Sequence, residues 1–385
     1  MPAGSGWRHA TAAAGEVRDG ELWGRGAIDT KGLGIAHLMA FLDVARSPLP
    51  RRRAVVFLAV ADEEAGGREG AGWLLEAHPE LFANVEAVLN EGGVNKAVAG
   101  RTLFWGIEVD QKRPLWLEVS AAGRAGHASA ANPESATHRL VSGLAALVAA
   151  PRPRRVNPAA TQFLAALARF DPQARAALAE LRALEARGDA NDSRPLSLPG
   201  FDSLLTDTLQ VTTLAGSERI NVVAGEAHAG IDVRLLPDTD EQAFVAGIER
   251  TLGPGFTVKV RLTSPAAPPS PVASQVFRTL AATLAAGGAA GASGAGGATT
   301  AAGSGARGVP LVPVVPAFIA AFTDSRYFRT RGIAAYGFSP FALDGLLLRT
   351  VHAPDERIPL ATFERGVETM IRVVRDLVLA ESAAP

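Results

Sequence analysis

Cysteine is absent from this chain of 385 residues, which excludes disulfide bonds and zinc sites built from thiolates. No apolar run is long enough to cross a membrane. The 38 Lys and Arg residues nearly balance the 39 Asp and Glu residues, for a net charge of −1. Because neither a basic surplus nor an acidic tail is present, we expect neither a nucleic acid nor a membrane as partner.

Three functional signatures are also missing. No signal peptide is visible, which favours a cytoplasmic location. No Gly-X-Ser-X-Gly elbow stands at a strand–helix turn, which argues against a hydrolase with a serine nucleophile. The Gly- and Ala-rich stretch 285–308 contains no Gly-Lys-Ser/Thr, so it is not a phosphate loop. Its composition predicts a flexible surface insertion instead.

The adjacent acids Glu63 and Glu64 are the most informative feature that is present. They follow the apolar run 54–60, which we interpret as a short, fully buried strand. Two neighbouring carboxylates at the end of a buried strand repel each other, and they persist at low cost when a cation such as a metal ion lies beside them. The simpler interpretation is a solvated turn, since most runs of charge are solvated.

Three further residues are candidate metal ligands: Asp29, Glu91 and His352. Asp29 stands just before a predicted helix near 31–46, so its simpler interpretation is a helix N-cap. Glu91 directly follows a short apolar strand, and His352 comes a short way after another. Ligands of open α/β sheets bind beyond the carboxyl ends of the strands, so these residues and Glu64 could converge there. Carboxylates with an imidazole suit zinc, manganese or cobalt.

The pattern of apolar residues divides the chain into three parts. Residues 1–113 alternate strand and helix signals, which predicts an α/β domain with a mostly parallel sheet flanked by helices. Residues 114–236 read as an inserted α+β domain, and residues 237–385 return to the first domain and end in an amphipathic helix near 361–380. Within the insert we expect helices near 134–149, 159–169 and 172–188, and strands near 115–120, 208–213 and 228–234.

Eight stretches together resemble one known family. They are GRGAIDTKG (24–32), ADEEAGG (61–67), NEGG (90–93), GRAGHAS (123–129), ERINVV (218–223), IDVRLLP (231–237), TDSRYF (323–328) and VHAPDERI (351–358). With them the chain resembles the metal-dependent exopeptidases and deacylases that include acetylornithine deacetylase, succinyl-diaminopimelate desuccinylase, aminoacylase and carboxypeptidase S, and it leans towards the carboxypeptidase S-like branch. The resemblance implies that the insert is a lid that also forms a homodimer interface.

The resemblance also implies roles for the acidic residues. Two zinc ions per site, or cobalt or manganese in their place, would be bridged by Asp29. Glu64 and His352 would hold one of the metals, and Glu91 would help to hold the other. Glu63 would act as the general base on a water molecule between the metals. The implied reaction is hydrolysis of an amide bond.

Four residues are implied as contacts of the substrate. His127 would reach the active site of the partner subunit and steady the oxyanion, although a lone loop histidine is usually just exposed. Asn221 and Arg234 would contact the substrate; the simpler interpretation of Asn221 is a turn residue. Arg326 is the better candidate for gripping a free carboxylate, because a guanidinium binds a carboxylate with two hydrogen bonds. We therefore expect carboxypeptidase, dipeptidase or aminoacylase activity on short peptides or N-acyl amino acids.

One element of the family pattern is not found. The first metal ligand of the family is a His in a His-X-Asp-Val-Val-Pro-like motif, and Met1 stands about where that motif would end. We therefore expect a chain that is truncated at its N-terminus. His9 is a weak candidate for a substitute, and its simpler interpretation is a surface-loop histidine. The alternative function is a catalytically impaired or inactive homologue that acts only as a dimerising or binding module.

Overall fold

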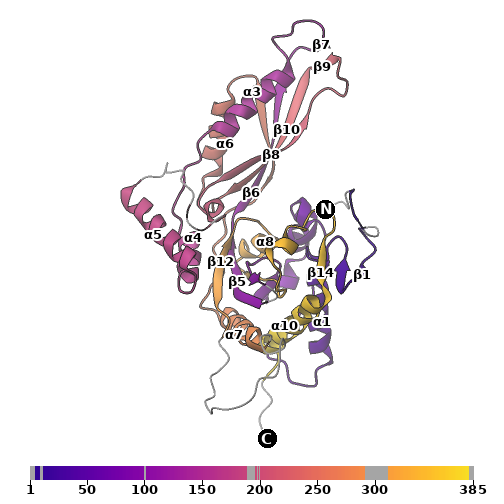
Figure 1. The fold of residues 1–385 in the computed structure, drawn as a ribbon, viewed down its shortest axis with the longest axis vertical. Coiled ribbons are helices and arrows are strands. Elements are labelled where there is room, and N and C mark those ends of the chain that lie inside the picture. The colour runs from indigo at the N-terminus through magenta and orange to yellow at the C-terminus, as the bar shows by residue number, and fades with distance from the viewer. Residues whose placement is uncertain are drawn as a thin grey trace. The chain divides into compact units, whose positions relative to one another are not determined.

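The computed structural model describes residues 5–8, 12–98, 101–188, 196, 198, 200–290 and 311–380. The chain forms two compact units. The first comprises Met1–Val109, Pro269–Ala317 and Thr323–Pro385, and the second comprises Asp110–Pro268 and Phe318–Phe322. Figure 1 shows the helices and strands of both units.

The first unit contains both helices and strands. In order they are β1 (Glu16–Arg18), β2 (Glu21–Trp23), α1 (Lys31–Arg46), α2 (Trp73–Ala77), β3 (Ala87–Asn90), β4 (Lys96–Val98), β5 (Arg101–Gln111), α7 (Gln275–Ala290), β12 (Val314–Ile319), α8 (Ser325–Arg329), β13 (Ala334–Gly337), α9 (Gly345–Leu348), β14 (Arg357–Pro359) and α10 (Leu360–Val378). The helices predicted near 31–46 and 361–380 are thus present as α1 and α10.

A mixed sheet forms the centre of the first unit. Its strand order is β12-β5-β13-β3, and β4 pairs with β5. Strand β3 runs parallel to β13, whereas β13 and β4 each pair with β5 in the antiparallel sense. The expected α/β class is confirmed, but the described part of this sheet is mixed and not mostly parallel.

Helix α10 packs against both α1 and α7 beside this sheet (Figure 1). Helix α10 is amphipathic and buries Met370, Val373 and Leu377 on one side. Helix α1 buries the small residues Ala36 and Ala40, both fully covered, which lets the two helices approach closely. These side chains belong to the largest apolar cluster of the unit. The 3.6-residue period of each helix therefore supplies the core face.

A small sheet joins the first and last segments of the first unit. Its order is β1-β2-β14, and the antiparallel register places Ile358 opposite Leu22 and Arg357 opposite Trp23. Ile358 is fully buried, so this pairing is anchored in the core. The pairing holds the segment that leads to residue 29 beside the segment that follows residue 352.

The apolar run 54–60, predicted as a fully buried strand, pairs with no strand among the described residues. Val56 is 78% exposed, whereas Val55 packs against the core. The prediction was wrong because an apolar run becomes a buried strand only where neighbouring strands pair with its edges and other elements cover both of its faces. Here only one face of the run is covered.

The second unit is built on an antiparallel sheet. Its elements are β6 (Arg113–Ala122), β7 (Gly126–His127), α3 (Ala136–Ala149), α4 (Pro158–Leu167), α5 (Pro172–Arg187), β8 (Thr208–Ala215), β9 (Val222–Val223), β10 (Glu226–Leu235), α6 (Glu241–Leu252) and β11 (Phe256–Thr263). The sheet order is β11-β6-β10-β8, and all three pairings are antiparallel. Helices α3 and α6 pack together, and their apolar residues share one core with those of the sheet.

The second unit extends further along the chain than expected. We expected a return to the first domain near residue 237, but the unit runs to Pro268. The reason is a pairing that is distant in sequence: β11 lies along β6, and α6 packs on α3. The stretch 285–308 was expected to be a flexible insertion, yet residues 285–290 belong to helix α7, and the remainder lies outside the described residues.

We expect the exposed apolar run 54–60 to limit solubility. The substitution Val56→Lys should reduce aggregation, measured by static light scattering, and should shift the melting temperature little, because surface changes alter the free energy of unfolding by about 0.5 kcal/mol or less. The matched variant Val55→Lys should lower the melting temperature, because Val55 packs against the core. Equal effects of the two variants on melting would contradict the one-sided burial of this run.

Candidate metal centre

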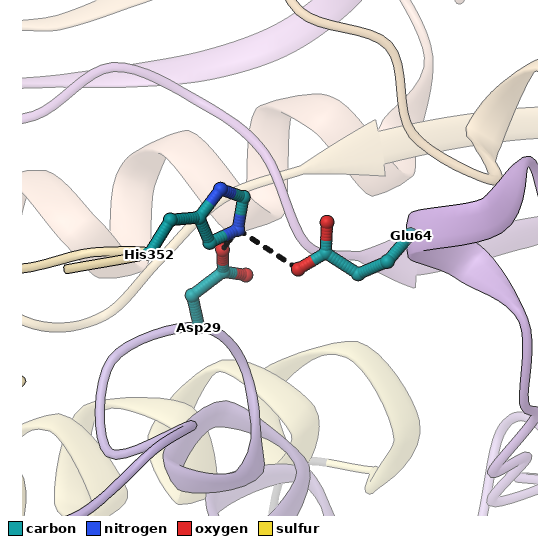
Figure 2. Close-up of side chains that lie close together, drawn as sticks. All are labelled: Asp29, Glu64 and His352. Atoms are coloured by element: carbon teal, nitrogen blue, oxygen red, sulfur yellow. Dashed lines mark hydrogen bonds and ion pairs between the residues drawn. The ribbon is translucent and has the colours of Figure 1, made fainter. Parts of the chain in front are cut away.

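Three side chains from distant parts of the first unit converge: Asp29, Glu64 and His352 (Figure 2). The Nε2 atom of His352 lies 2.9 Å from Oδ2 of Asp29 and 2.8 Å from Oε1 of Glu64. One ligand atom from each residue lies within 4.8 Å of the other two. The expectation that these three residues meet is therefore fulfilled, while their role as metal ligands stays a prediction.

Asp29 stands at the entrance of helix α1 but is not its cap. The N-cap position belongs to Thr30, whose side chain makes no capping hydrogen bond. The peptide bond between Asp29 and Thr30 is cis. The carboxylate of Asp29 is instead directed at His352 (Figure 2). The N-cap interpretation of Asp29 is therefore wrong, because the side chain faces a cluster of distant residues and not the first turn of the helix.

Glu64 is presented by a sharp turn. Residues Glu63–Ala65 form a short 3-10 helix, and Asp62 before it has a left-handed φ of 74°. Gly66 and Gly67 follow with φ values of 108° and 63°, a region that glycine adopts without strain. The carboxylate of Asp62 accepts a hydrogen bond of 2.8 Å from the amide of Glu69, which closes the turn.

Two side chains of α8 hold this turn from outside. The hydroxyl of Tyr327 donates a hydrogen bond of 2.7 Å to the carbonyl oxygen of Gly66, and the guanidinium of Arg326 donates to the same oxygen. Arg326 is 4% exposed, donates to the carbonyl of Thr323 at 2.9 Å, and lies 4.4 Å from the centre of the Tyr327 ring. These contacts position the Glu63–Glu64 turn. The predicted grip of Arg326 on a substrate carboxylate stays a prediction.

His352 lies in the loop between α9 and β14 with a positive φ of 60°. Few residues other than glycine adopt this conformation, and it concentrates at functional sites where the surroundings enforce it. Here the enforcing contacts come from both sides of the loop. The amide of Ala353 donates to the carbonyl of Thr350 at 3.0 Å, and β14 is paired with β2.

Glu63 and Glu91 interact electrostatically with members of this cluster, and Asp324 interacts with Glu63 and Glu91 in turn. Burial, followed by the charges of Asp324 and Glu64, raises the pKa of Glu63 to about 7. Burial and then the charge of Glu63 raise the pKa of Glu91 to about 9. Burial raises the pKa of Asp324 to about 6. All three groups therefore resist ionisation unless a positive charge enters the site.

Sequence reasoning missed Asp324, although it lies in the TDSRYF stretch that carries the family resemblance. Its side chain is 4% exposed and packs against Gly67, where an added Cβ would come within 1.9 Å of Oδ1 of Asp324. The small residue at position 67 is therefore required by the carboxylate beside it. The signal that could have found Asp324 is the Gly66-Gly67 pair, which leaves room for a large neighbour.

Glu91 remains outside the three-residue cluster. It follows β3, and its carboxyl and that of Asp29 repel each other, which contributes to its raised pKa. In the described part of the chain, Asp29, Glu64 and His352 form the single group of three or more such residues whose ligand atoms all lie within 4.8 Å of one another. His9, the weak substitute for the unmatched histidine, lies outside the described residues.

The predicted substrate residues other than Arg326 belong to the second unit. His127 is exposed in β7, and its Nδ1 lies 2.7 Å from the hydroxyl of Ser129. Asn221 is exposed before β9, and its carbonyl accepts a hydrogen bond from the amide of Ala128 at 3.0 Å. Arg234 makes two hydrogen bonds to Asp232, at 2.6 and 2.7 Å, and stacks on a phenylalanine ring at 4.3 Å. Their roles towards a substrate stay predictions.

The donor set of the cluster fits a transition-metal ion. Zinc binds histidine nitrogen and carboxylate oxygen at about 2 Å, so two ligand atoms of one ion lie about 3–4 Å apart. The two distances from His352, 2.8 and 2.9 Å, are close to that range. One imidazole with two carboxylates suits zinc, cobalt or manganese. The positive charge would also offset the repulsion among the surrounding acids.

The comparisons with known proteins agree on one family. The family model described as peptidase family M20/M25/M40 matches residues 1–376. Aminoacylase-1 of Pongo abelii is 25% identical over 96% of this chain and 75% of its own length. The probable carboxypeptidase S-like 2 of Dictyostelium discoideum is 24% identical over 96% of this chain and 68% of its own length.

A solved structure shows the same fold. The M20 family metallo-carboxypeptidase Sso-CP2 from Sulfolobus solfataricus superimposes with a TM-score of 0.63 at 16% identity. The match covers 96% of this chain and 80% of that chain. At this identity the likeness concerns the fold alone.

The raised pKa values predict how stability depends on pH in metal-free protein. Glu63 and Glu91 bind protons in the folded state up to about pH 7 and about pH 9, whereas ordinary glutamates release them near 4.5. Their contribution to stability is therefore fully present below pH 4.5 and is lost as the pH rises through 7 and 9. With a chelator present, the melting temperature should fall between pH 6 and pH 9.

A divalent metal should flatten this fall, because a bound cation favours the ionised carboxylates. Differential scanning fluorimetry with EDTA and with zinc, at matched pH values, measures both curves. The variant Glu63→Gln should show a smaller fall in the chelated state. A chelated melting temperature that is flat or rising from pH 6 to pH 9 would show that these carboxyl groups are not protonated in the folded protein.

Proposed function

Because the chain belongs to the peptidase family M20/M25/M40, we propose that this hydrolase is zinc-dependent and cleaves amide bonds in short peptides or N-acyl amino acids. The observation that carries the proposal is the convergence of Asp29, Glu64 and His352 on one point. The names of the two relatives, an aminoacylase and a carboxypeptidase, support this class of substrate.

Asp29, Glu64 and His352 would hold the metal. When bound, a metal of this kind polarises a carbonyl group and lowers the pKa of its water. A second ion would take Asp29 and Glu91, but a zinc site has roughly three protein ligands and this pair supplies two in the described residues. We therefore expect the Asp29–Glu64–His352 site to bind zinc more tightly than the second site. Two ions per active site remain a prediction.

Glu63 would be the general base. A base works best when its pKa lies near the working pH, and burial together with Asp324 and Glu64 raises the pKa of Glu63 to about 7. Glu63 would accept a proton from the attacking water and return it to the leaving amine. Glu63 precedes Glu64 in a turn that Tyr327 holds, which supports a place for its carboxyl beside the proposed metal ligands.

The remaining predicted residues would contact the substrate. Arg326 would bind the free carboxylate of the substrate, and Asn221 and Arg234 would contact the rest. His127 would donate to the oxyanion from the partner subunit of a homodimer that would form through the lid.

The cytoplasmic location also stays a prediction. Within the described ranges, no helix combines the length and apolar character of a membrane span.

The second candidate function is a binding or dimerising module without catalysis. One observation favours it: the described residues supply one complete three-ligand group and leave the second pair incomplete. A module of this kind would bind one metal ion per chain and a peptide or acyl amino acid without turnover. Glu63 distinguishes the two functions, because its carboxylate is needed for hydrolysis and is not needed for binding.

We expect His352→Ala to abolish tight metal binding. Changes to groups that merely support metal ligands already weaken binding about 10–100-fold, so loss of one of three ligands should exceed about 100-fold. Isothermal titration with zinc, and the visible spectrum with cobalt, measure the affinity. The matched control is His78→Ala, which removes a histidine that is 46% exposed and pairs with Glu80. Equal affinities of the two variants would exclude His352 as a ligand.

We expect Glu63→Gln to lower kcat by about 10²–10⁴-fold, because glutamine has nearly the same shape but cannot accept the proton. Zinc affinity should stay within a few fold of the original. The control is Glu69→Gln, an exposed glutamate six residues further along the same stretch. Turnover is measured on a panel of dipeptides and N-acyl amino acids with added zinc or cobalt. Unchanged turnover of Glu63→Gln would remove Glu63 from the reaction, and zinc binding without any turnover by the original chain would favour the binding module.

A further inference from the structure

We propose that Glu356 is the positioning residue of the metal site: its buried carboxylate holds the backbone of Asp29 and thereby fixes the Asp29 carboxylate against His352. This inference rests on the proposed metal site and adds a residue to which neither the family resemblance nor the metal cluster assigns a role. Glu356 comes four residues after His352 and is fully buried.

Both oxygens of Glu356 are engaged by the turn that carries Asp29. Oε1 accepts a hydrogen bond of 2.9 Å from the amide of Ile28 and one of 3.0 Å from the amide of Asp29 itself. Oε2 accepts a hydrogen bond of 2.7 Å from the guanidinium of Arg25. One carboxylate therefore binds three donors within a stretch of five residues.

The backbone of Glu356 adds a fourth connection. Its carbonyl oxygen accepts a hydrogen bond of 3.0 Å from the amide of Gly24. Arg25, in turn, lies over the Trp7 ring, 5.4 Å from its centre. The whole turn from Gly24 to Asp29 is therefore tied to a single residue at the other end of the chain.

A merely structural ion pair does not account for this geometry. A buried carboxylate needs hydrogen bonds or an opposite charge, and Arg25 alone would supply the charge. The two amide bonds go further, because they select the peptide groups on either side of the Ile28 Cα. With its amide held at Oε1, Asp29 has a fixed Cα, and its Oδ2 lies 2.9 Å from His352. Glu356 thus connects two metal ligands through one rigid link.

Two substitutions separate the parts of this role. Glu356→Gln keeps an oxygen that can accept from both amides but removes the charge opposite Arg25. Glu356→Ala removes the charge and the acceptor together. The control is Asp43→Asn, which removes the charge from another guanidinium–carboxylate pair of the same unit, Arg375 with Asp43 at 2.9 Å between α10 and α1. Asp43 contacts none of the metal-cluster residues through this pair.

The experiment measures zinc affinity by isothermal titration for the full chain and all three variants, with melting temperatures alongside. Loss of a group that orients a metal ligand weakens binding about 10–100-fold, and we expect this for Glu356→Ala. Glu356→Gln should lose less, and Asp43→Asn should keep the original affinity even where its melting temperature falls. Lower melting temperatures with unchanged zinc affinity in both Glu356 variants would reduce Glu356 to a structural residue and overturn the proposal.

A second measurement needs no metal. Hydrogen exchange of the chelated protein should show faster exchange at the amides of Ile28 and Asp29 in Glu356→Ala than in Asp43→Asn, and slower exchange in Glu356→Gln than in Glu356→Ala. Absence of zinc binding by the original chain would refute the proposed function. The exchange rates of the two amides would still show whether Glu356 holds the backbone of Asp29. Unchanged protection of the two amides would overturn the positioning role. Glu356→Gln serves for both measurements if Glu356→Ala does not fold.

Discussion

The burial of several acidic side chains in one region is the constraint on which the rest of the first unit depends. Asp29, Glu63, Glu91 and Asp324 all have raised pKa values, and for each of them burial is the largest cause. A fold that places such groups together needs compensation. His352 lies between two of the carboxylates, and Arg326 opposes the charge of Glu63. A divalent cation would complete this compensation, and the fold keeps the acids close enough to receive one.

The sequence predicts elements whose signal is local, and it fails where distant pairing decides the outcome. Helices α1 and α10 follow from apolar periodicity and match the structure. The run 54–60 has the composition of a buried strand, but burial depends on neighbours that its own residues do not specify. The late end of the second unit has the same cause, because β11 belongs to that unit through its pairing with β6.

The residues of the candidate site also fall into those that the sequence could predict and those that depend on distant contacts. Asp29, Glu64 and His352 could be named in advance because each occurs in a recognisable stretch. The meeting of Asp29 with His352, however, follows from the pairing of β2 with β14. Asp324 and Glu356 escaped notice because Asp324 packs against Gly67 and Glu356 accepts two hydrogen bonds from backbone amides, contacts that a sequence does not display. Arg326 is the opposite case. Its motif predicts a contact with the substrate, whereas two of its hydrogen bonds go to backbone carbonyl groups of the protein itself.

Because the chain is synthesised from its N-terminus, strand β2 can pair with β14 only after the second unit has been made. His352 is synthesised 288 residues after Glu64, and the whole second unit is made between them. That antiparallel unit contains its own core and can fold before His352 is available to the acids of the first unit. The three-residue centre therefore cannot assemble until the second unit has been synthesised. Until then the growing chain carries Asp29 and Glu64 without the imidazole that lies between them.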